Sequence, residues 1–220
     1  ELDKIVSEEQ ARATVLEDLI AQILLSQAAR AAGFEITESD LQSRLDALAA
    51  RLGGAEALAR WQSAHGYSEA SFRTALKRAA EAAWMRDQII SAVPVTAEQV
   101  HLQQILVYNE TTAQQLLEQL KNGADFNELA ARADPLTHGE LGWVPRGYLL
   151  DSQIEQAAFR LQPGEFSEVI ATPAGFHILR VLEREANRPL SPDALLQLQE
   201  QALQDWLNQR RAQSQITLTP

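Results

Sequence analysis

Gly139-Glu140-Leu141-Gly142-Trp143 opens a run of five short motifs that occupy about 40 residues of the chain. The other four, in order, are Arg146-Gly147, Ala157-Ala158-Phe159, Pro163-Gly164-Glu165 and Gly175-Phe176-His177-Ile178. Glycine and proline recur throughout this run, and these residues mark turns between elements of secondary structure. The run therefore predicts short strands and a helix that are joined by tight turns.

The sequence on either side of this run completes a mixed unit of strands and helices. Alternating and helical apolar patterns predict strands at 102–108, 139–144, 166–171 and 175–183, and helices at 112–122, 126–133 and 152–161. The expected order is β-α-α-β-α-β-β. Thr96 and Gln99, which precede the first strand, are expected to cap a short turn.

The first hundred residues are expected to be helical. Apolar residues recur at helical spacing behind a capping-box pattern that begins at Ser7, and the helix is expected to run to Gly33. Thr37 and Ser68 are expected to cap further helices, which end at Gly53 and Pro94. A short segment is predicted between them, around Leu58 and Trp61, and it ends at His65-Gly66-Tyr67.

A last amphipathic helix begins at Ser191, with Pro192 at its first helical position. An isolated helix of this size is marginal in water, so its apolar face needs a partner. We expect it to return to the N-terminal helices. The predicted organisation is an α+β chain with a helical domain over 1–95, completed by 190–220, and an inserted domain over 96–189.

Composition excludes several classes of function. The 220 residues include no cysteine, so disulfides, thiolate metal sites and a cysteine nucleophile are excluded. A net charge of −11 disfavours nucleic acid as a partner. No apolar stretch approaches the roughly 18 residues that a membrane span needs. The four histidines show no metal-ligand spacing, and Gly53-Gly54 lacks the lysine of a phosphate loop, so neither a metal nor a cofactor is expected.

The five motifs, in this order and with these gaps, resemble the parvulin peptidyl-prolyl isomerases, and the likeness covers about residues 97–187. The resemblance implies a four-stranded antiparallel sheet flanked by helices and an enzyme that isomerises X-Pro bonds. Helices before the domain and one helix after it resemble the plan of the SurA- and PrsA-like foldases. That likeness implies unfolded or proline-containing polypeptides as clients and an extracytoplasmic location, with any targeting segment outside the printed sequence.

The resemblance also implies two sets of site residues. The polar, catalytic positions are His177, Gln104, Asp134 and Thr172. The substrate-binding positions are Leu141, Leu149, Ile154 and Phe176.

One departure from the family pattern concerns the first strand, which reads Gln104-Ile105-Leu106-Val107 where the family usually has His-Ile-Leu-Val. His101 lies three residues away, on the opposite face of a strand, and is a poor substitute. Glutamine still donates and accepts hydrogen bonds, and one such bond contributes about 1 kcal/mol. An attenuated isomerase and an inactive one both remain open. Ala174 stands where some relatives have serine. Phosphorylated substrates are not expected, because Tyr108 stands where the phosphate-directed members of the family carry a basic residue and no arginine pair follows it.

Each of these residues also has a structural alternative. His177 can be a hydrogen-bonded core histidine, Asp134 can begin a turn before Pro135, and the apolar positions can belong to the core. The apolar faces of the helical half can be buried entirely by internal packing, or they can leave a groove that binds unfolded polypeptide. Two further functions stay open: a binding module that keeps the isomerase fold as a scaffold, and a helical assembly protein that forms a homodimer through residues 1–32.

Overall fold

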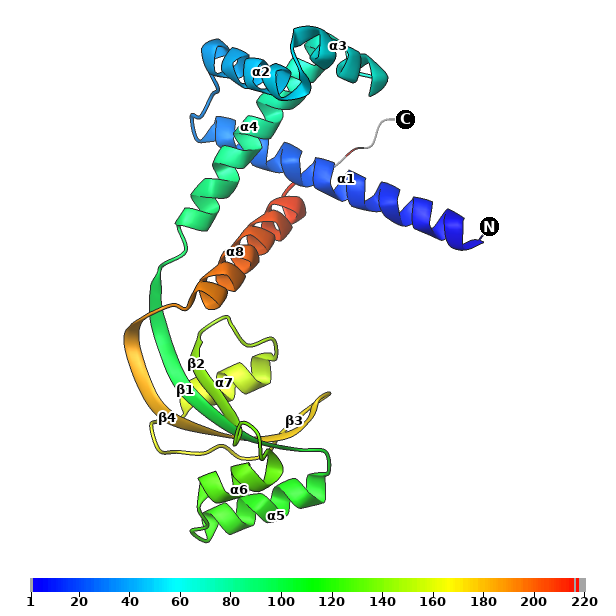
Figure 1. Cartoon of the computed structure of the whole chain (residues 1–220). Coiled ribbons are helices and arrows are strands. Elements are labelled where there is room, and N and C mark those ends of the chain that lie inside the picture. The colour runs from blue at the N-terminus through cyan, green and yellow to red at the C-terminus, as the bar shows by residue number, and fades with distance from the viewer. Residues whose placement is uncertain (1, 216, 218–220) are drawn as a thin grey trace. The chain divides into compact units, whose positions relative to one another are not determined.

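The computed structural model describes residues 2–215 and 217. The chain divides into two compact units. The first comprises Glu1–Ala92 and Gln199–Pro220, and the second comprises Val93–Leu198. Figure 1 shows helices in the first unit, and strands with shorter helices in the second.

The first unit contains α1 (Leu2–Ala31), α2 (Glu38–Leu52), α3 (Ala55–Ala64) and α4 (Glu69–Ser91). Side-chain caps begin two of these helices, as the sequence predicts. The Thr37 hydroxyl accepts a hydrogen bond from the backbone N–H of Asp40 at 3.1 Å. Ser68 and Ser71 form a reciprocal capping box at the start of α4.

The predicted start of the first helix is wrong. The helix begins at Leu2, so Ser7 lies inside α1 and does not cap it. A capping pattern marks a helix start only where the chain before it leaves the helical conformation. Here the preceding residues continue the helix, and the pattern has no effect on where it begins.

The last helix, α8 (Pro192–Ala212), contacts the N-terminal helices, as expected. The Arg211 guanidinium of α8 forms an ion pair with the Glu17 carboxylate of α1 and also donates to the Glu17 carbonyl oxygen at 3.3 Å. Ser191 caps α8 by accepting a hydrogen bond from the N–H of Ala194 at 3.2 Å. Within the described residues, no helix combines the length and the apolar character that crossing a membrane requires.

The second unit contains an antiparallel sheet of four described strands in the order β2-β1-β4-β3. Its elements follow the predicted order β-α-α-β-α-β-β. They are β1 (Thr96–Val107), α5 (Glu110–Lys121), α6 (Phe126–Ala133), β2 (Glu140–Pro145), α7 (Ser152–Arg160), β3 (Ile170–Thr172) and β4 (Gly175–Pro189).

The two central strands are longer than the sequence predicts. β1 begins at Thr96, where a short turn was expected, and it pairs with β4 as far as Pro189. Gln99 is buried in this extension, and its side-chain amide donates to the carbonyl oxygens of Arg188 and Pro189. Only long-range pairing makes this polar segment a strand. β3 is shorter than expected, because Phe166 forms just an isolated bridge, with Arg180.

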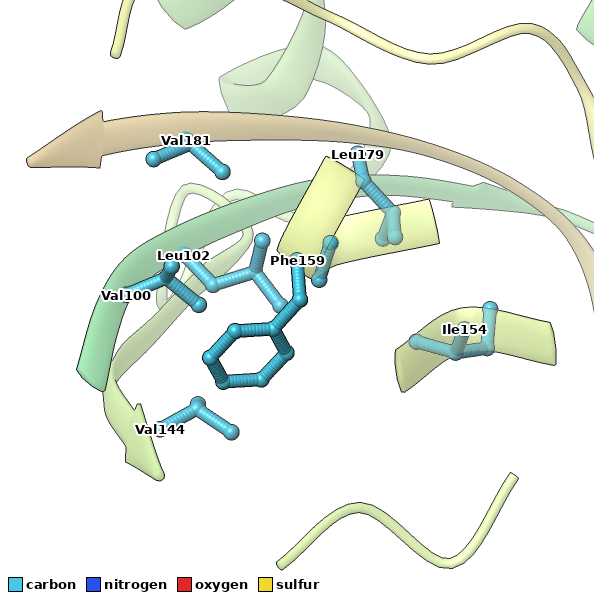
Figure 2. Packing of buried hydrophobic residues seen from close by; sticks show 8 residues of the cluster. Val100, Leu102, Val144, Ile154, Phe159, Leu179 and Val181 are labelled. Atoms are coloured by element: carbon cyan, nitrogen blue, oxygen red, sulfur yellow. The ribbon is translucent and has the colours of Figure 1, made fainter. Parts of the chain in front are cut away.

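Helices lie on both faces of the sheet (Figure 1), and each face carries its own apolar core. On one face, Ile105 and Ile178 pack with residues of α5 and α6. On the other, Phe159 of α7 packs among Val100, Leu102 and Val144 (Figure 2). The rest of this second cluster is Ile154, Ala158, Leu179 and Val181. The helices thus cover both faces and fix the register of β1 against β4.

Candidate functional site

His177 lies on β4, on the face of the sheet that α7 covers. It pairs with Leu106 of β1 on one side and with Ile170 of β3 on the other. Side chains along a strand alternate between faces, so Gln104, two residues before Leu106, shares the face of His177. Thr172 lies on the same face, because it pairs with Gly175, which is two residues before His177 on β4.

A chain of hydrogen bonds joins Gln104, His177 and Thr172. The Nδ1–H of His177 donates to Oε1 of Gln104 across 3.0 Å. With the proton on Nδ1, the Nε2 atom accepts from the Thr172 hydroxyl across 2.9 Å. That hydroxyl oxygen in turn accepts from the backbone N–H of Ala174 at 3.1 Å. The contacts hold the imidazole in one orientation and one tautomer.

Burial lowers the pKa of His177 below its usual range, and the nearby Asp151 carboxylate opposes this effect by favouring the charged ring. The histidine is 8% exposed, so its charged form loses most of its hydration. The ring is therefore neutral at pH 7. It acts as a hydrogen-bond donor and acceptor in a site that is partly shielded from water.

Asp134 does not hydrogen-bond to His177 within the described structure. Its carboxylate accepts from the N–H groups of Leu136 and Thr137 and from the Thr137 hydroxyl, which organises the turn after α6. The Thr137 hydroxyl, first among these bonds, lowers the pKa of Asp134. The structure therefore shows Asp134 in the turn-forming role that the sequence left open.

This turn packs against the strand that carries Gln104. The N–H of Gln104 donates to the carbonyl oxygen of Gly139 at 2.8 Å. Gly139 has φ of +71°, and a Cβ atom added there would lie 1.9 Å from the carbonyl oxygen of Gln104. Only glycine allows the two backbones to approach so closely. The turn that Asp134 organises thus contacts the backbone of Gln104.

Leu149 and Ile154 lie beside the same face. Ile154 belongs to the buried cluster under α7, and Leu149 and Ile170 pack against that cluster. The loop between Leu149 and Ile154 contains Asp151, whose carboxylate caps α7 by accepting from the N–H of Ile154 at 3.1 Å. This carboxylate also favours the charged form of the His177 ring, so Asp151 lies within electrostatic range of the imidazole.

Leu141 occupies an irregular position on β2. The register with β1 shifts between Leu102 and Gln103, whose partners are Gly142 and Glu140, so Leu141 has no paired residue there. Gly142 has φ of +73°, which suits a β-bulge. Leu141 is 37% exposed, in contrast to the buried Ile154.

The structure does not bring Phe176 to this face. Phe176 pairs with Val107 of β1 and Ala171 of β3, and it directly precedes His177 on β4. Neighbouring strand residues point to opposite faces, so its side chain lies on the side that α5 and α6 cover. Strand alternation therefore places Phe176 on the face opposite His177, and its expected role in substrate binding stays a prediction.

Sequence reasoning missed Asp151 and Ile170. Asp151 precedes the predicted helix, where an aspartate is a common cap, and that pattern could have identified the residue as an ordered charge. Ile170 is placed opposite His177 by the pairing of β3 with β4. No local sequence pattern indicates that pairing.

His101 lies apart from the site, as strand alternation predicts. Its ring stacks on Trp143, and its nitrogen atoms face the carboxylates of Glu140 and Glu183. Among the residues that the structure describes, no three histidine, aspartate or glutamate side chains gather in a way that could hold a metal ion.

Comparisons with known proteins identify the domain. Residues 106–183 match the Rotamase family model, which is described as a PPIC-type PPIASE domain. The chain is 33% identical to Chaperone SurA of Thiobacillus denitrificans over 57% of this chain and 34% of SurA. It is 35% identical to Foldase protein PrsA of a Geobacillus species over 40% of this chain and 33% of PrsA. The matches cover about a third of the length of these two relatives.

A solved structure shares the fold. The peptidyl-prolyl isomerase PrsA from Bacillus cereus matches with a TM-score of 0.60 and 20% identity, over 100% of this chain and 88% of that chain. The chain thus carries a parvulin-type PPIC domain within a fold that combines N-terminal helices, the contacting helix α8 and an inserted antiparallel sheet. SurA and PrsA foldases are its homologues.

Proposed function

We propose that this protein is a folding factor that binds unfolded polypeptides and catalyses the cis-trans isomerisation of their X-Pro bonds. The observation that carries the proposal is the hydrogen-bond chain from Gln104 through His177 to Thr172. The chain lies on the sheet face where Leu149 and Ile154 pack. Polar groups and apolar surface thus meet at one place, as a prolyl substrate requires.

The chemistry needs neither a nucleophile nor a metal. Rotation about the X-Pro bond breaks amide resonance, against a barrier of about 18–20 kcal/mol. A catalyst lowers this barrier by binding the twisted amide more tightly than the planar one. Hydrogen bonds that favour the twisted carbonyl or nitrogen supply that preference, and an apolar contact holds the ring.

The proposed division of roles follows the geometry. His177, Gln104 and Thr172 form the polar part, and the Asp134 turn positions Gln104 through Gly139. In the described structure, Oε1 of Gln104 accepts from His177, which leaves its side-chain NH₂ group available to a substrate carbonyl. Leu141, Leu149 and Ile154 hold the prolyl ring in this proposal.

A second candidate function is a chaperone or binding module whose isomerase domain is weak or inactive. The residue that favours it is Gln104, which stands where the family usually has histidine. Substituting His for Gln104 separates the two candidates. A large gain in turnover would mean that the present site is attenuated, whereas an unchanged rate would place Gln104 outside the catalytic contacts.

We also propose a role for each part of the whole protein. We place the client-binding function in the helical part, 1–95 with 190–220, and isomerisation in 96–189. Unfolded or proline-containing polypeptides are the proposed clients, and an extracytoplasmic compartment is the proposed location. The homology to Chaperone SurA and Foldase protein PrsA supports both statements.

The test is a refolding reaction whose slow phase is prolyl isomerisation, together with the isomerisation of a short X-Pro peptide. Wild-type protein should accelerate both, and His177→Ala should reduce kcat/KM at least tenfold. Gln114, which is exposed on α5, provides the control substitution Gln114→Ala, which should change neither rate. If wild type accelerates neither reaction, the isomerase proposal is wrong.

A further inference from the structure

A groove of about 360 Å³ opens on the surface of the helical unit. Side chains from three helices line it: α2 contributes Leu48, Arg51 and Leu52, α3 contributes Leu58 and Trp61, and α4 contributes Phe72. It is separate in sequence from the His177 site, and the proposed isomerisation does not use it.

The groove leaves large apolar side chains exposed to solvent. Leu52 is 43% exposed and Trp61 is 38% exposed, whereas Leu58, between them in sequence, is buried. Contiguous exposed apolar surface on a folded protein marks a site of interaction more often than isolated exposed residues do. The internal packing of the helical unit therefore does not bury the apolar side chains that line this groove.

Aromatic contacts hold the groove in shape. The Trp61 ring packs edge-to-face against Phe72 at 5.9 Å and stacks on His65 at 4.1 Å between ring centroids. Tyr67 also packs edge-to-face on Phe72. Because neighbouring rings fix the orientation of Trp61, a ligand would not have to order it on binding.

The groove carries a positive charge, whereas the chain as a whole is negatively charged. Arg51 is the only charged residue among the described residues that line it, although the chain carries a net charge of −11. The nearby Arg60 and Arg73 form ion pairs with Glu56 and Glu38, but within the described part of the chain Arg51 has no such partner. An unpaired cation beside apolar surface favours a ligand that combines both complementary features.

We propose that this groove binds a segment of unfolded polypeptide in which an acidic residue adjoins a large apolar side chain. The apolar side chain packs against Leu52, Trp61 and Phe72, and the carboxylate pairs with the Arg51 guanidinium. The inference rests on the proposed client-binding function and specifies the surface and the client chemistry.

A larger cleft on the helical unit differs from the groove in charge, so the two would prefer clients of different charge. It has a volume of about 600 Å³, and Glu35, Asp40 and Asp87 line it together with Arg44. A cleft with this excess of carboxylates would not prefer acidic segments. A preference for acidic clients therefore reports on the groove that contains Arg51.

The test uses two fluorescein-labelled decapeptides with the same Leu-Phe centre, flanked in one by aspartate and in the other by lysine. Wild-type protein should bind the aspartate peptide about fivefold more tightly at low salt, as expected for a partly exposed ion pair, and 1 M NaCl should remove most of the difference. Arg51→Glu should reverse the preference and Arg51→Gln should abolish it. Trp61→Ser should weaken binding of both peptides about tenfold.

The matched control is Arg86→Glu, which makes the same charge change on α4 outside the groove and should leave the preference unchanged. Circular dichroism checks that each variant is folded, and isomerisation of a short X-Pro peptide should be the same in wild type and Arg51→Glu. Equal affinities of wild type for the two peptides, or equal effects of Arg51→Glu and Arg86→Glu, would overturn the proposal.

Two outcomes distinguish a failure of the groove assignment from a failure of the proposed client-binding function. If wild type suppresses client aggregation while Arg51→Glu and Trp61→Ser do so equally well, clients bind elsewhere and only the groove assignment fails. If wild type binds neither peptide and suppresses no aggregation, the client-binding function itself fails. A homodimer in sedimentation that Trp61→Ser dissociates would mean that a second copy occupies the groove, which also overturns the proposal.

Discussion

Gln104 and His177 are hydrogen-bonded across neighbouring strands, with 3.0 Å between Oε1 and Nδ1. The two residues are separated by 73 positions in the sequence. The bond fixes the proton on Nδ1, so that Nε2 accepts from the Thr172 hydroxyl. Gln104 thus contacts the imidazole directly, at the position where the resemblance leads us to expect a histidine.

Removing the side-chain amide of Gln104 should weaken catalysis moderately. We expect Gln104→Ala to lower kcat/KM about fivefold, because one hydrogen bond to His177 is lost and such a bond contributes about 1 kcal/mol. Kinetics on an X-Pro peptide give the rate, and ¹⁵N spectra of the imidazole report its tautomer. Gln114→Ala, on the exposed face of α5, is the control. An unchanged rate and tautomer would show that Gln104 does not orient the ring.

The His177 pKa predicts how stability depends on pH. Burial lowers the pKa in the folded state, so between the folded value and the unfolded value of about 6.5 the unfolded chain binds more protons. The contribution of His177 to stability should therefore be complete above pH 6.5 and be lost as the pH falls through the folded pKa. Urea unfolding across this range, compared with that of His177→Gln, measures the difference.

Asp151→Asn should lower the His177 pKa further, because the Asp151 carboxylate favours the charged ring. Asparagine keeps the oxygen that caps α7, so the helix should remain intact. Titration of the His177 imidazole by NMR measures the change, with His65 as an internal reference. A pKa that rises on this substitution would contradict the assigned effect of Asp151.

Gly139→Ala should cost more stability than its backbone conformation alone explains. Strain at a positive φ costs roughly 1 kcal/mol, and the Gly139 Cβ would also overlap the Gln104 carbonyl oxygen at 1.9 Å. We expect a total loss of about 3 kcal/mol and reduced isomerase activity. Gly123→Ala is the matched control, because Gly123 has φ of +92° with no atom within 4 Å of the added Cβ. Equal losses in urea unfolding would contradict a close approach at Gly139.

Ile154 and Leu141 should respond differently to truncation. Ile154→Ala opens a cavity in the buried cluster and should cost about 3 kcal/mol of folding free energy. Leu141→Ala removes a side chain that is 37% exposed and should cost less than about 1 kcal/mol, while raising KM for an X-Pro peptide. Urea unfolding and steady-state kinetics separate the two. A large loss of stability with unchanged KM for Leu141→Ala would place Leu141 in the core.

Local chemistry made several elements predictable from sequence. Thr37 and Ser68 begin helices because their hydroxyl groups satisfy backbone N–H groups a few residues away. The same is true of Ser191 and α8. The failure at Ser7 has the complementary reason: a cap acts only where the helix begins, and the residues before Ser7 are already helical.

The sequence by itself determined the ordered motifs, the type and order of most elements, and the chemistry of residues such as His177. These features depend on composition, periodicity and contacts within a few residues. Tertiary structure alone decided that β1 extends back to Thr96, that the Asp134 turn contacts Gln104, and that the Asp151 carboxylate lies within electrostatic range of His177. The register of β1 against β4 and the docking of α7 decide these relationships, because they join segments that lie tens of residues apart.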